Sequence, residues 1–202
     1  MPDYEVKEWN ETNSPLDNSY TRAAYGQKHW AKLSNYVRLH ALYAEGGIYL
    51  DTDVEVVRTL TPLLRHECFL GFQVEEENVD WVNNAVLGAR PGHHFLRRGM
   101  ELTVRLFEEE GEFYRSPAVM TAVLKGMGLS AYGLQEVGGV NVYPAEYFYP
   151  YPWFGEFTPG CVTENTFCVH RWAGSWMRPG PPGLPLPRRV MRRLTRALAR
   201  DC

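Results

Sequence analysis

The feature that most constrains this chain is the segment at residues 43–56, which joins a helix end to a short apolar strand through a glycine pair. Gly46 and Gly47 suit the left-handed backbone conformation that closes a helix. The Ile48-Tyr49-Leu50 run that follows is β-branched, aromatic and apolar, which is typical of a buried strand. The segment therefore predicts a helix that leads directly into a strand, with two carboxylates where that strand ends.

These two carboxylates belong to Asp51 and Asp53. In an extended segment, side chains two residues apart leave the same face, so we expect the two acids to lie side by side. Adjacent carboxylates repel each other unless a cation lies beside them, and hard divalent ions prefer such oxygen ligands. The motif also occurs in ordinary turns. The apolar strand and glycine pair in front of it favour a site for a metal-bound diphosphate over a plain turn.

Length and charge limit the other options. A chain of 202 residues with 45% hydrophobic residues suits one globular domain. The net charge of −3 gives no case for nucleic-acid binding. The charge is unevenly distributed, because residues 188–202 hold six Arg and one Asp, a net +5, whereas the other 187 residues carry 15 basic and 23 acidic side chains, a net −8.

The cysteines and the hydropathy of the chain indicate an intracellular setting. No apolar run reaches bilayer length and no secretory leader precedes the body, so we expect a cytoplasmic protein. Cys68, Cys161, Cys168 and Cys202 form no C-x-x-C pattern and indicate no disulfide framework. Cys161, Cys168 and His170 resemble part of a zinc site, but without a fourth ligand buried thiols are the favoured interpretation.

Hydrophobic periodicity predicts alternating strands and helices. Strands are expected at residues 3–9, 48–50, 54–57, 68–72, 85–89, 140–143 and 167–172. Helices are expected at residues 20–25, 30–45, 94–109 and 117–127, with a further one opened by Thr61 as cap and Pro62 as first helical residue. The second helix should bury a stripe of Leu33, Val37, Ala41 and Ala44, widened by Tyr36, Leu39 and Tyr43.

Two further segments have alternative interpretations. Residues 147–154 form an aromatic, proline-punctuated loop that suits either a packed surface loop or a wall for sugar stacking. Residues 179–187 are rich in Pro and Gly and predict an extended linker. Residues 188–202 predict a basic amphipathic helix, which suits the surface of an anionic membrane or, alternatively, docking on the acidic body.

Several motifs together resemble one known family. Lys32-Leu33-Ser34-Asn35-Tyr36-Val37-Arg38-Leu39, followed by residues 42–53 with Asp51-Thr52-Asp53, is similar to the Asp-x-Asp glycosyltransferases of family 32. These are the relatives of yeast initiation mannosyltransferases and bacterial capsular-polysaccharide transferases. The resemblance continues through residues 83–89, 91–93 and 144–148 and ends at residues 170–176. Such a set of spaced motifs is more specific than Asp-x-Asp alone.

The resemblance implies a GT-A-like, Rossmann-like α/β fold with a mixed sheet flanked by helices. It also implies retaining transfer of a hexose from a nucleotide-diphosphate sugar, with Mn²⁺ or Mg²⁺ as cofactor. By position in the motifs, Asp51 should contact the ribose or sugar of the donor and Asp53 should bind the metal. Arg38 should reach the donor sugar's hydroxyls, and His170 should add a metal or diphosphate contact.

Five more residues are implied by the same motifs. Asn84 should lie under the donor sugar or the acceptor, and Ser175 and Trp176 should lie near the diphosphate. Ser34 and Asn35 occupy the place of a Ser-Asp pair that is usual in the family. Asparagine keeps a hydrogen-bond acceptor but lacks the charge, so a weaker sugar or ribose contact is expected. Relatives also carry a strand and a helix before the segment that matches Pro2-Asp3-Tyr4-Glu5, so we expect a truncated nucleotide-binding half.

These observations predict a glycosyltransferase domain at residues 1–178, a linker at 179–187 and a basic helix at 188–202. The expected partners are a UDP-sugar or GDP-mannose and a glycan or lipid-linked acceptor, with an anionic membrane bound through residues 188–202. The protein would then lie peripherally on the inner membrane face. Two alternatives are a catalytically impaired partner subunit that binds sugar nucleotides and a haloacid-dehalogenase-like phosphatase, which also places Asp-x-Asp after an apolar strand.

Overall fold

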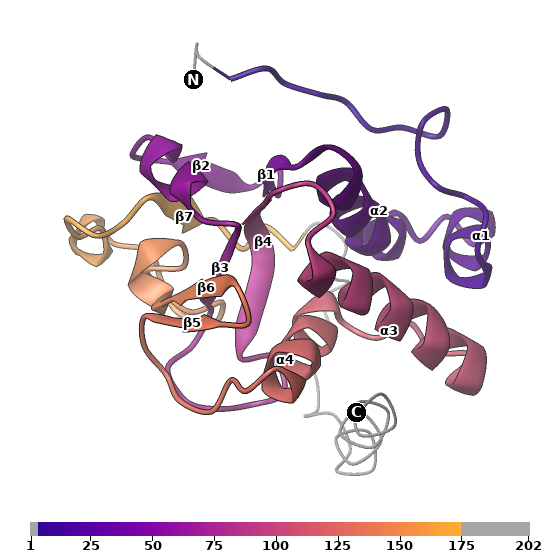
Figure 1. The fold of residues 1–202 in the computed structure, drawn as a ribbon. Helices are drawn as coiled ribbons and strands as arrows, with labels where there is room; N and C mark the ends of the chain where they lie inside the picture. Colours follow the sequence, from indigo (N-terminus) through magenta and orange to yellow (C-terminus); the bar gives the residue numbers. More distant parts are fainter. Residues whose placement is uncertain (1–3, 175–202) are drawn as a thin grey trace.

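The computed structural model describes residues 4–174, and Figure 1 shows a central sheet with the main helices on one side. The helices are α1 (Ser19–Gly26), α2 (Trp30–Glu45), α3 (His94–Glu110) and α4 (Ser116–Gly126), with 3-10 turns η1 (Thr61–Arg65), η2 (Ala145–Tyr147) and η3 (Pro159–Cys161). The strands are β1 (Gly47–Leu50), β2 (Val54–Val56), β3 (Cys68–Phe72), β4 (Val82–Ala89), β5 (Gln135–Val137), β6 (Val140–Tyr143) and β7 (Cys168–His170). The predicted α/β class with a GT-A-like mixed sheet is confirmed.

The strand order places the ends of three strands at one edge of the sheet. Five strands follow the order β1-β4-β3-β6-β5, and β2 pairs separately with β7. Because β4 is antiparallel to both β1 and β3, and β3 is parallel to β6, strands β1, β3 and β6 run in the same direction. Their carboxyl ends therefore meet at one edge, which is where ligands bind in open α/β sheets.

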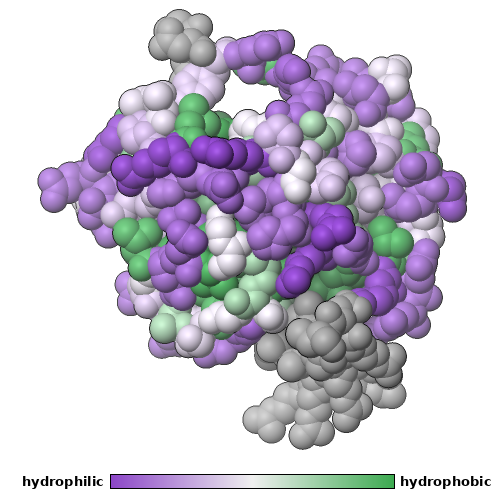
Figure 2. Space-filling model, in the orientation of Figure 1, coloured by the Kyte–Doolittle hydropathy of each residue, from purple (hydrophilic) through white to green (hydrophobic). Residues whose placement is uncertain are grey.

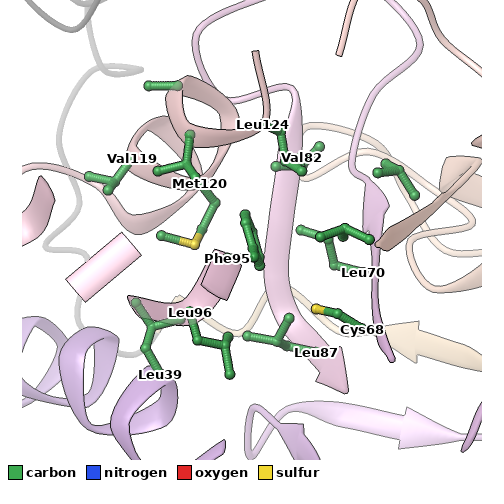
Figure 3. Close-up of a cluster of buried hydrophobic side chains, with 14 of the residues drawn as sticks. Leu39, Cys68, Leu70, Val82, Leu87, Phe95, Leu96, Val119, Met120 and Leu124 are labelled. Carbon is green, nitrogen blue, oxygen red and sulfur yellow. The ribbon is translucent and has the colours of Figure 1, made fainter. Parts of the chain in front are cut away.

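The larger apolar core lies between the sheet and helices α2, α3 and α4. Alternate residues of β3 face it, because side chains leave a strand on alternating sides, and β4 contributes Val82, Leu87 and Ala89. Figure 3 shows these side chains packed against residues from the helices. The labelled members of this buried cluster are Leu39, Cys68, Leu70, Val82, Leu87, Phe95, Leu96, Val119, Met120 and Leu124.

A second apolar cluster covers the other face of the sheet and is rich in aromatic rings. It is made by residues of η1, β3, β4, β6 and β7 and of the segment after η2, and its largest members are Phe69, Tyr143, Phe148, Tyr149 and Phe167. The ring of Phe69 faces Gly88, where an added Cβ would lie only 2.0 Å from Phe69 Cε1. This cluster joins the β2–β7 pair to the main sheet, so it fixes the elements that carry the acidic motif.

Helix α2 has the predicted bounds but buries a different face. Its buried residues are Arg38, Leu39 and Leu42, whereas the predicted stripe of Leu33, Val37, Ala41 and Ala44 is half-buried or exposed. The residues predicted to widen the stripe are confirmed, because Leu39 is buried and Tyr36 and Tyr43 pack against the core. The stripe was wrong because α2 packs against α1, α3 and the ends of β1 and β4, and this packing turns Leu39 and Leu42 toward the core. The same rotation brings Arg38 to the end of β1.

Other predictions need correction at the level of single elements. The strand expected at residues 3–9 is wrong for the described residues 4–9, which pair with no described strand. A lone segment of strand-like sequence is not stable without a partner. The short strand β5 was missed, and Thr61 is the first residue of η1 rather than its cap, which is Leu60 without a side-chain hydrogen bond.

The predicted linker at 179–187 and the basic helix at 188–202 lie outside the described residues, as do Ser175 and Trp176. Among residues 4–174, no helix combines the length and the apolar character needed to cross a membrane. Figure 2 shows that the face seen in Figure 1 is mostly hydrophilic, with small and separate apolar patches.

Candidate active site and metal centre

The glycine pair and β1 place Asp51 at the carboxyl edge of the sheet. Gly46 and Gly47 have positive φ angles of 71° and 101°, as predicted, and they turn the chain from α2 into β1. The backbone N–H of Asp51 donates to the Ala85 carbonyl at 2.8 Å, which ties the end of β1 to β4. The Asp51 carbonyl then accepts from the Val54 N–H at 3.0 Å and closes a turn.

The motif is therefore a turn between β1 and β2, and the predicted extended geometry is wrong. Its two carboxylates still converge, because the β2–β7 pair directs Asp53 back toward the end of β1. In that pair Val54 lies opposite His170, and the Arg171 N–H donates to the Asp53 carbonyl at 2.9 Å. The sequence left two interpretations of Asp-x-Asp, an ordinary turn and a ligand-binding pair. The structure shows a turn whose two carboxylates converge, so the two interpretations are compatible.

Three side chains form a compact group of possible metal ligands. One ligand atom each from Asp51, Asp53 and His170 lies within 4.8 Å of the others. The three residues come from separate places, the end of β1, the following turn and the end of β7. The side chains of Asp51 and Asp53 are 27% and 22% exposed, whereas that of His170 is 8% exposed. Solvent therefore reaches the group through the two carboxylates.

The donor set fits a divalent cation. Two carboxylates and one imidazole suit Mn²⁺ or Mg²⁺ more than a soft thiolate-seeking ion. Burial lowers the pKa of His170 more than Asp53 and Asp51 raise it, so its imidazole is neutral at pH 7 and has a free electron pair. His170 Nε2 lies 3.1 Å from Asp53 Oδ1, and the Ala173 N–H donates to Asp53 Oδ2 at 2.9 Å.

Arg38 supplies a fixed cation beside Asp51. Its side chain is 7% exposed, and its Nη2 lies 3.1 Å from Asp51 Oδ1. The Tyr49 hydroxyl donates to the same oxygen at 2.7 Å, and the guanidinium lies 4.5 Å from the centre of the Tyr49 ring. Repulsion between the two carboxylates is therefore already reduced by protein groups, so the pair by itself does not require a metal.

The remaining predicted residues divide into those that touch Arg38 and those that do not. Ser34 Oγ lies 3.5 Å from Arg38 Nη2, and the Asn84 backbone carbonyl accepts from Arg38 Nη1 at 3.1 Å. The Asn84 side chain is buried and donates to Ser116 Oγ at 2.7 Å, so its amide is not presented as a free ligand group. Asn35 interacts instead with the hydroxyl of Tyr20.

Asn84 lies where the pairing of β3 and β4 is irregular. Gly88 is opposite Phe69, but Asn83 is opposite Gly71, so β4 bulges between these points. A bulge redirects side chains and is common next to active sites. Here it turns Asn84 toward α4, whose first residue is Ser116. Sequence pattern alone could not predict this, because strand periodicity assumes regular pairing.

Several contributing groups were missed in the sequence. Tyr49 stands two residues before Asp51, a spacing that could have indicated a shared side of the strand. Trp172 has a positive φ of 51°, which brings the next N–H to Asp53, and its ring lies 4.1 Å from the His170 ring. Positive φ in a bulky residue is strained and clusters at functional sites.

A charged pair lies near the start of β4 at the same edge of the sheet. Arg115 Nη2 contacts Asp80 Oδ2 at 2.6 Å, next to Ser116 of α4. Asp80 is 9% exposed, and burial raises its pKa above the ordinary value. The pair thus adds a partly buried charged contact beside Ser116, the residue that holds the Asn84 side chain.

The zinc interpretation of Cys161, Cys168 and His170 finds no support. Within residues 4–174, His170 groups with the two aspartates rather than with sulfur ligands. Cys168 is a buried member of β7 opposite Val56, and burial raises the pKa of its thiol to about 12. A thiol of that kind is protonated at pH 7 and does not act as a thiolate ligand.

Comparison with known proteins assigns the family. Residues 1–70, which include the Asp-x-Asp turn, match the glycosyltransferase sugar-binding region containing the DXD motif. The chain is 31% identical over 152 residues to lactosylceramide 4-alpha-galactosyltransferase of Rattus norvegicus, covering 69% of this chain and 40% of that protein. It is 33% identical over 100 residues to inositol phosphoceramide mannosyltransferase 3 of Schizosaccharomyces pombe, covering 47% and 27%.

A third relative is alpha-1,4-N-acetylglucosaminyltransferase of Homo sapiens, 30% identical over 115 residues that cover 56% of this chain and 32% of the relative. The chain thus spans less than half the length of these three curated relatives. All three are sugar transferases by name, and the matched family region contains the acidic motif that the fold places at the sheet edge. The chain belongs to the family of glycosyltransferases whose sugar-binding region contains a DXD motif.

Proposed function

We propose that the protein is a metal-dependent, retaining glycosyltransferase that moves a hexose from a nucleotide-diphosphate sugar to a glycan or lipid-linked acceptor. The observation that carries this proposal is the convergence of Asp51, Asp53 and His170 beside the buried Arg38. Carboxylates and a neutral imidazole suit a divalent ion, and a guanidinium beside them suits sugar hydroxyls or phosphate oxygens.

Each residue has a distinct part in this proposal. Asp53 and His170 would hold a divalent ion, Mn²⁺ or Mg²⁺, which stabilises the negative charge that develops on a departing diphosphate. Arg38 is held in place by Ser34, Asn84 and Asp51, so it binds the donor sugar without first losing side-chain freedom. Tyr49 orients Asp51 toward the ribose or sugar through the hydrogen bond at its Oδ1.

The acceptor is proposed from the relatives. Two of them carry the names of ceramide lipids, lactosylceramide and inositol phosphoceramide, as the molecules they modify. We propose a lipid-linked acceptor here, with the protein working as a cytoplasmic enzyme at the inner face of a membrane. The basic residues at 188–202 support an anionic membrane as the partner, because each Arg near such a surface adds about 1 kcal/mol of attraction.

The direct test is turnover of candidate donors. The full chain is incubated with UDP-glucose, UDP-galactose, UDP-N-acetylglucosamine or GDP-mannose in Mn²⁺, and release of the nucleoside diphosphate is measured. We expect release with at least one donor, loss of release on adding EDTA, and loss in Asp53→Ala. Glu55→Gln changes an exposed side chain of β2, two residues from Asp53, and serves as the matched control, which should retain activity.

The same assay separates the alternatives. Binding of a donor without any release would identify a sugar-nucleotide-binding partner subunit. Release of phosphate from sugar phosphates without sugar transfer would identify a phosphatase of the haloacid-dehalogenase type, an interpretation that the family assignment already disfavours. Release that is insensitive to both EDTA and Asp53→Ala would contradict the proposed metal-dependent transfer.

A further inference from the structure

The aromatic loop after β6 divides into a buried part and an exposed tip. Phe148, Tyr149 and Tyr151 are 0%, 1% and 9% exposed, so this part packs as an ordinary surface loop. Trp153 and Phe154 are 50% and 71% exposed. In Figure 1 the light-orange segment that contains this loop lies beside the β2–β7 pair. The loop therefore combines a packed base with an apolar tip.

The tip is a tight turn with two large rings at its corners. The Gly155 N–H donates to the Pro152 carbonyl at 2.9 Å, so Trp153 and Phe154 are the two central residues of a four-residue turn. Pro, Asn, Asp and Gly usually occupy these positions. Their rings meet edge to face, with centroids 5.5 Å apart and planes at 87°. Exposed rings in this position bury little surface within the chain and are available to a partner.

The base of the loop is fastened to the metal-ligand group. The Trp172 Nε1–H donates to the Tyr151 carbonyl at 3.0 Å, and the Trp172 ring lies 4.1 Å from the ring of His170. Tyr149 packs 5.9 Å from His170, and its hydroxyl accepts from the Val86 N–H at 3.1 Å. The tip, two residues beyond Tyr151, is thus held in a fixed relation to the candidate active site.

We propose that the Trp153–Phe154 turn is a membrane wedge, which enters the interfacial layer of the bilayer that carries the acceptor lipid. This inference rests on the lipid-linked acceptor of the proposed function. A bilayer fits better than a stacked sugar, because two perpendicular rings offer no common flat face, whereas Trp and Phe on one short turn are suited to the membrane–water interface. Insertion of the tip places a lipid head group next to the loop that is fastened to His170.

The test uses the full chain and vesicles of zwitterionic phosphatidylcholine at high salt, which suppresses electrostatic binding by the arginines at 188–202. The variant is Trp153→Ser with Phe154→Ser. The matched control is Trp30→Ser, which removes another exposed Trp ring, 56% exposed and packed against Tyr25 on the α1–α2 side of the molecule. We expect co-sedimentation to fall about tenfold or more in the double variant and to stay unchanged in the control.

Activity provides the second measurement. The same acceptor glycan is presented once as a lipid in vesicles and once as a water-soluble glycoside. The double variant should lose transfer to the vesicle acceptor and keep transfer to the water-soluble one. Equal loss on both acceptors would show that the rings contact sugar, and this would overturn the wedge. Unchanged vesicle binding of the double variant would overturn it as well.

The two proposals fail in different ways. If the wild-type chain transfers sugar to neither acceptor, the proposed function fails, but co-sedimentation still decides whether the turn binds the bilayer. If transfer occurs and the double variant matches the wild type on vesicles, only the wedge fails. Thermal unfolding of both variants checks that the fold is intact, and we expect melting temperatures close to that of the wild type, because both rings of the tip are exposed.

Discussion

Single residues show how two acids are accommodated at the end of a strand. Asp51 pairs with the Arg38 guanidinium and accepts a hydrogen bond from the Tyr49 hydroxyl, whereas Asp53 lies 3.1 Å from His170 Nε2 and accepts from the Ala173 N–H. Each carboxylate is therefore oriented by its own set of donors. An arrangement fixed before ligand binding is what catalysis by charge stabilisation requires. The site depends on these donors as much as on the motif itself.

Arg38→Lys tests the most constrained of them. Lysine keeps the charge but cannot contact Ser34, Asn84 and Asp51 together, because it lacks the planar fork of donors. We expect the free energy of unfolding to fall by about 1–3 kcal/mol, measured by urea denaturation. Arg90→Lys is the control, because Arg90 is 62% exposed and lies 3.9 Å from Glu67. Equal losses in the two variants would contradict the role given to Arg38.

A second residue-scale prediction concerns pH and the start of α3. His93 caps this helix, with Nδ1 accepting from the Phe95 N–H at 3.3 Å, which requires the neutral ring. Burial first, and then His94, lower the pKa of His93, while Glu67 acts in the opposite direction. As the pH falls, His93 is therefore protonated at a higher pH in the unfolded chain than in the folded one. The free energy of unfolding decreases as the pH drops below about 6.5 toward the lowered pKa of the folded state.

His93→Asn removes this titration and keeps a cap, because Asn is a favoured N-cap residue. Between pH 7.5 and pH 5.5, the wild type should lose more unfolding free energy than the variant, by an amount on the order of 1 kcal/mol, the worth of one cap. Urea denaturation at a series of pH values measures the difference. Parallel stability curves for the two proteins would show that His93 does not titrate in this way.

At the scale of elements, the sequence predicted what depends on local pattern. Helices α1 to α4 and strands β1, β3 and β6 lie where glycine stops and apolar periodicity place them. Which face of α2 is buried, and whether residues 4–9 form a strand, depend on the elements that pack against them. Periodicity contains no information on those neighbours, so the Leu33–Ala44 stripe and the first strand were predicted wrongly.

The candidate site follows the same division. Asp51, Asp53, Arg38 and His170 could be named from motifs, and the structure brings them together. The role of Asn84 as a buried link depends on a bulge in β4, and sequence alone does not show it. The contribution of Ala173 depends on the positive φ of Trp172, which a tryptophan in the sequence does not indicate.

The junction of α2 and β1 gives a prediction about one element boundary. Gly46 and Gly47 both have positive φ, but only at Gly46 would an added Cβ clash, at 2.6 Å from Pro91 Cδ and 3.0 Å from the Ala89 carbonyl oxygen. Gly47→Ala should cost about 1–3 kcal/mol from backbone strain, and Gly46→Ala should cost at least about 1 kcal/mol more. Thermal or urea unfolding compares the two, and a smaller loss at Gly46 would contradict this geometry.

For the whole molecule, the central claim is that the carboxyl edge of the sheet binds a nucleoside diphosphate through a divalent ion. The most direct measurement is isothermal titration of UDP and of GDP into the full chain, with Mn²⁺ and then with EDTA. We predict binding of at least one nucleotide in Mn²⁺, none in EDTA, and an affinity at least about tenfold weaker in Asp53→Asn, which is about 1.4 kcal/mol. Equal nucleotide affinity with and without the metal, or in Asp53→Asn and the wild type, would contradict the claim.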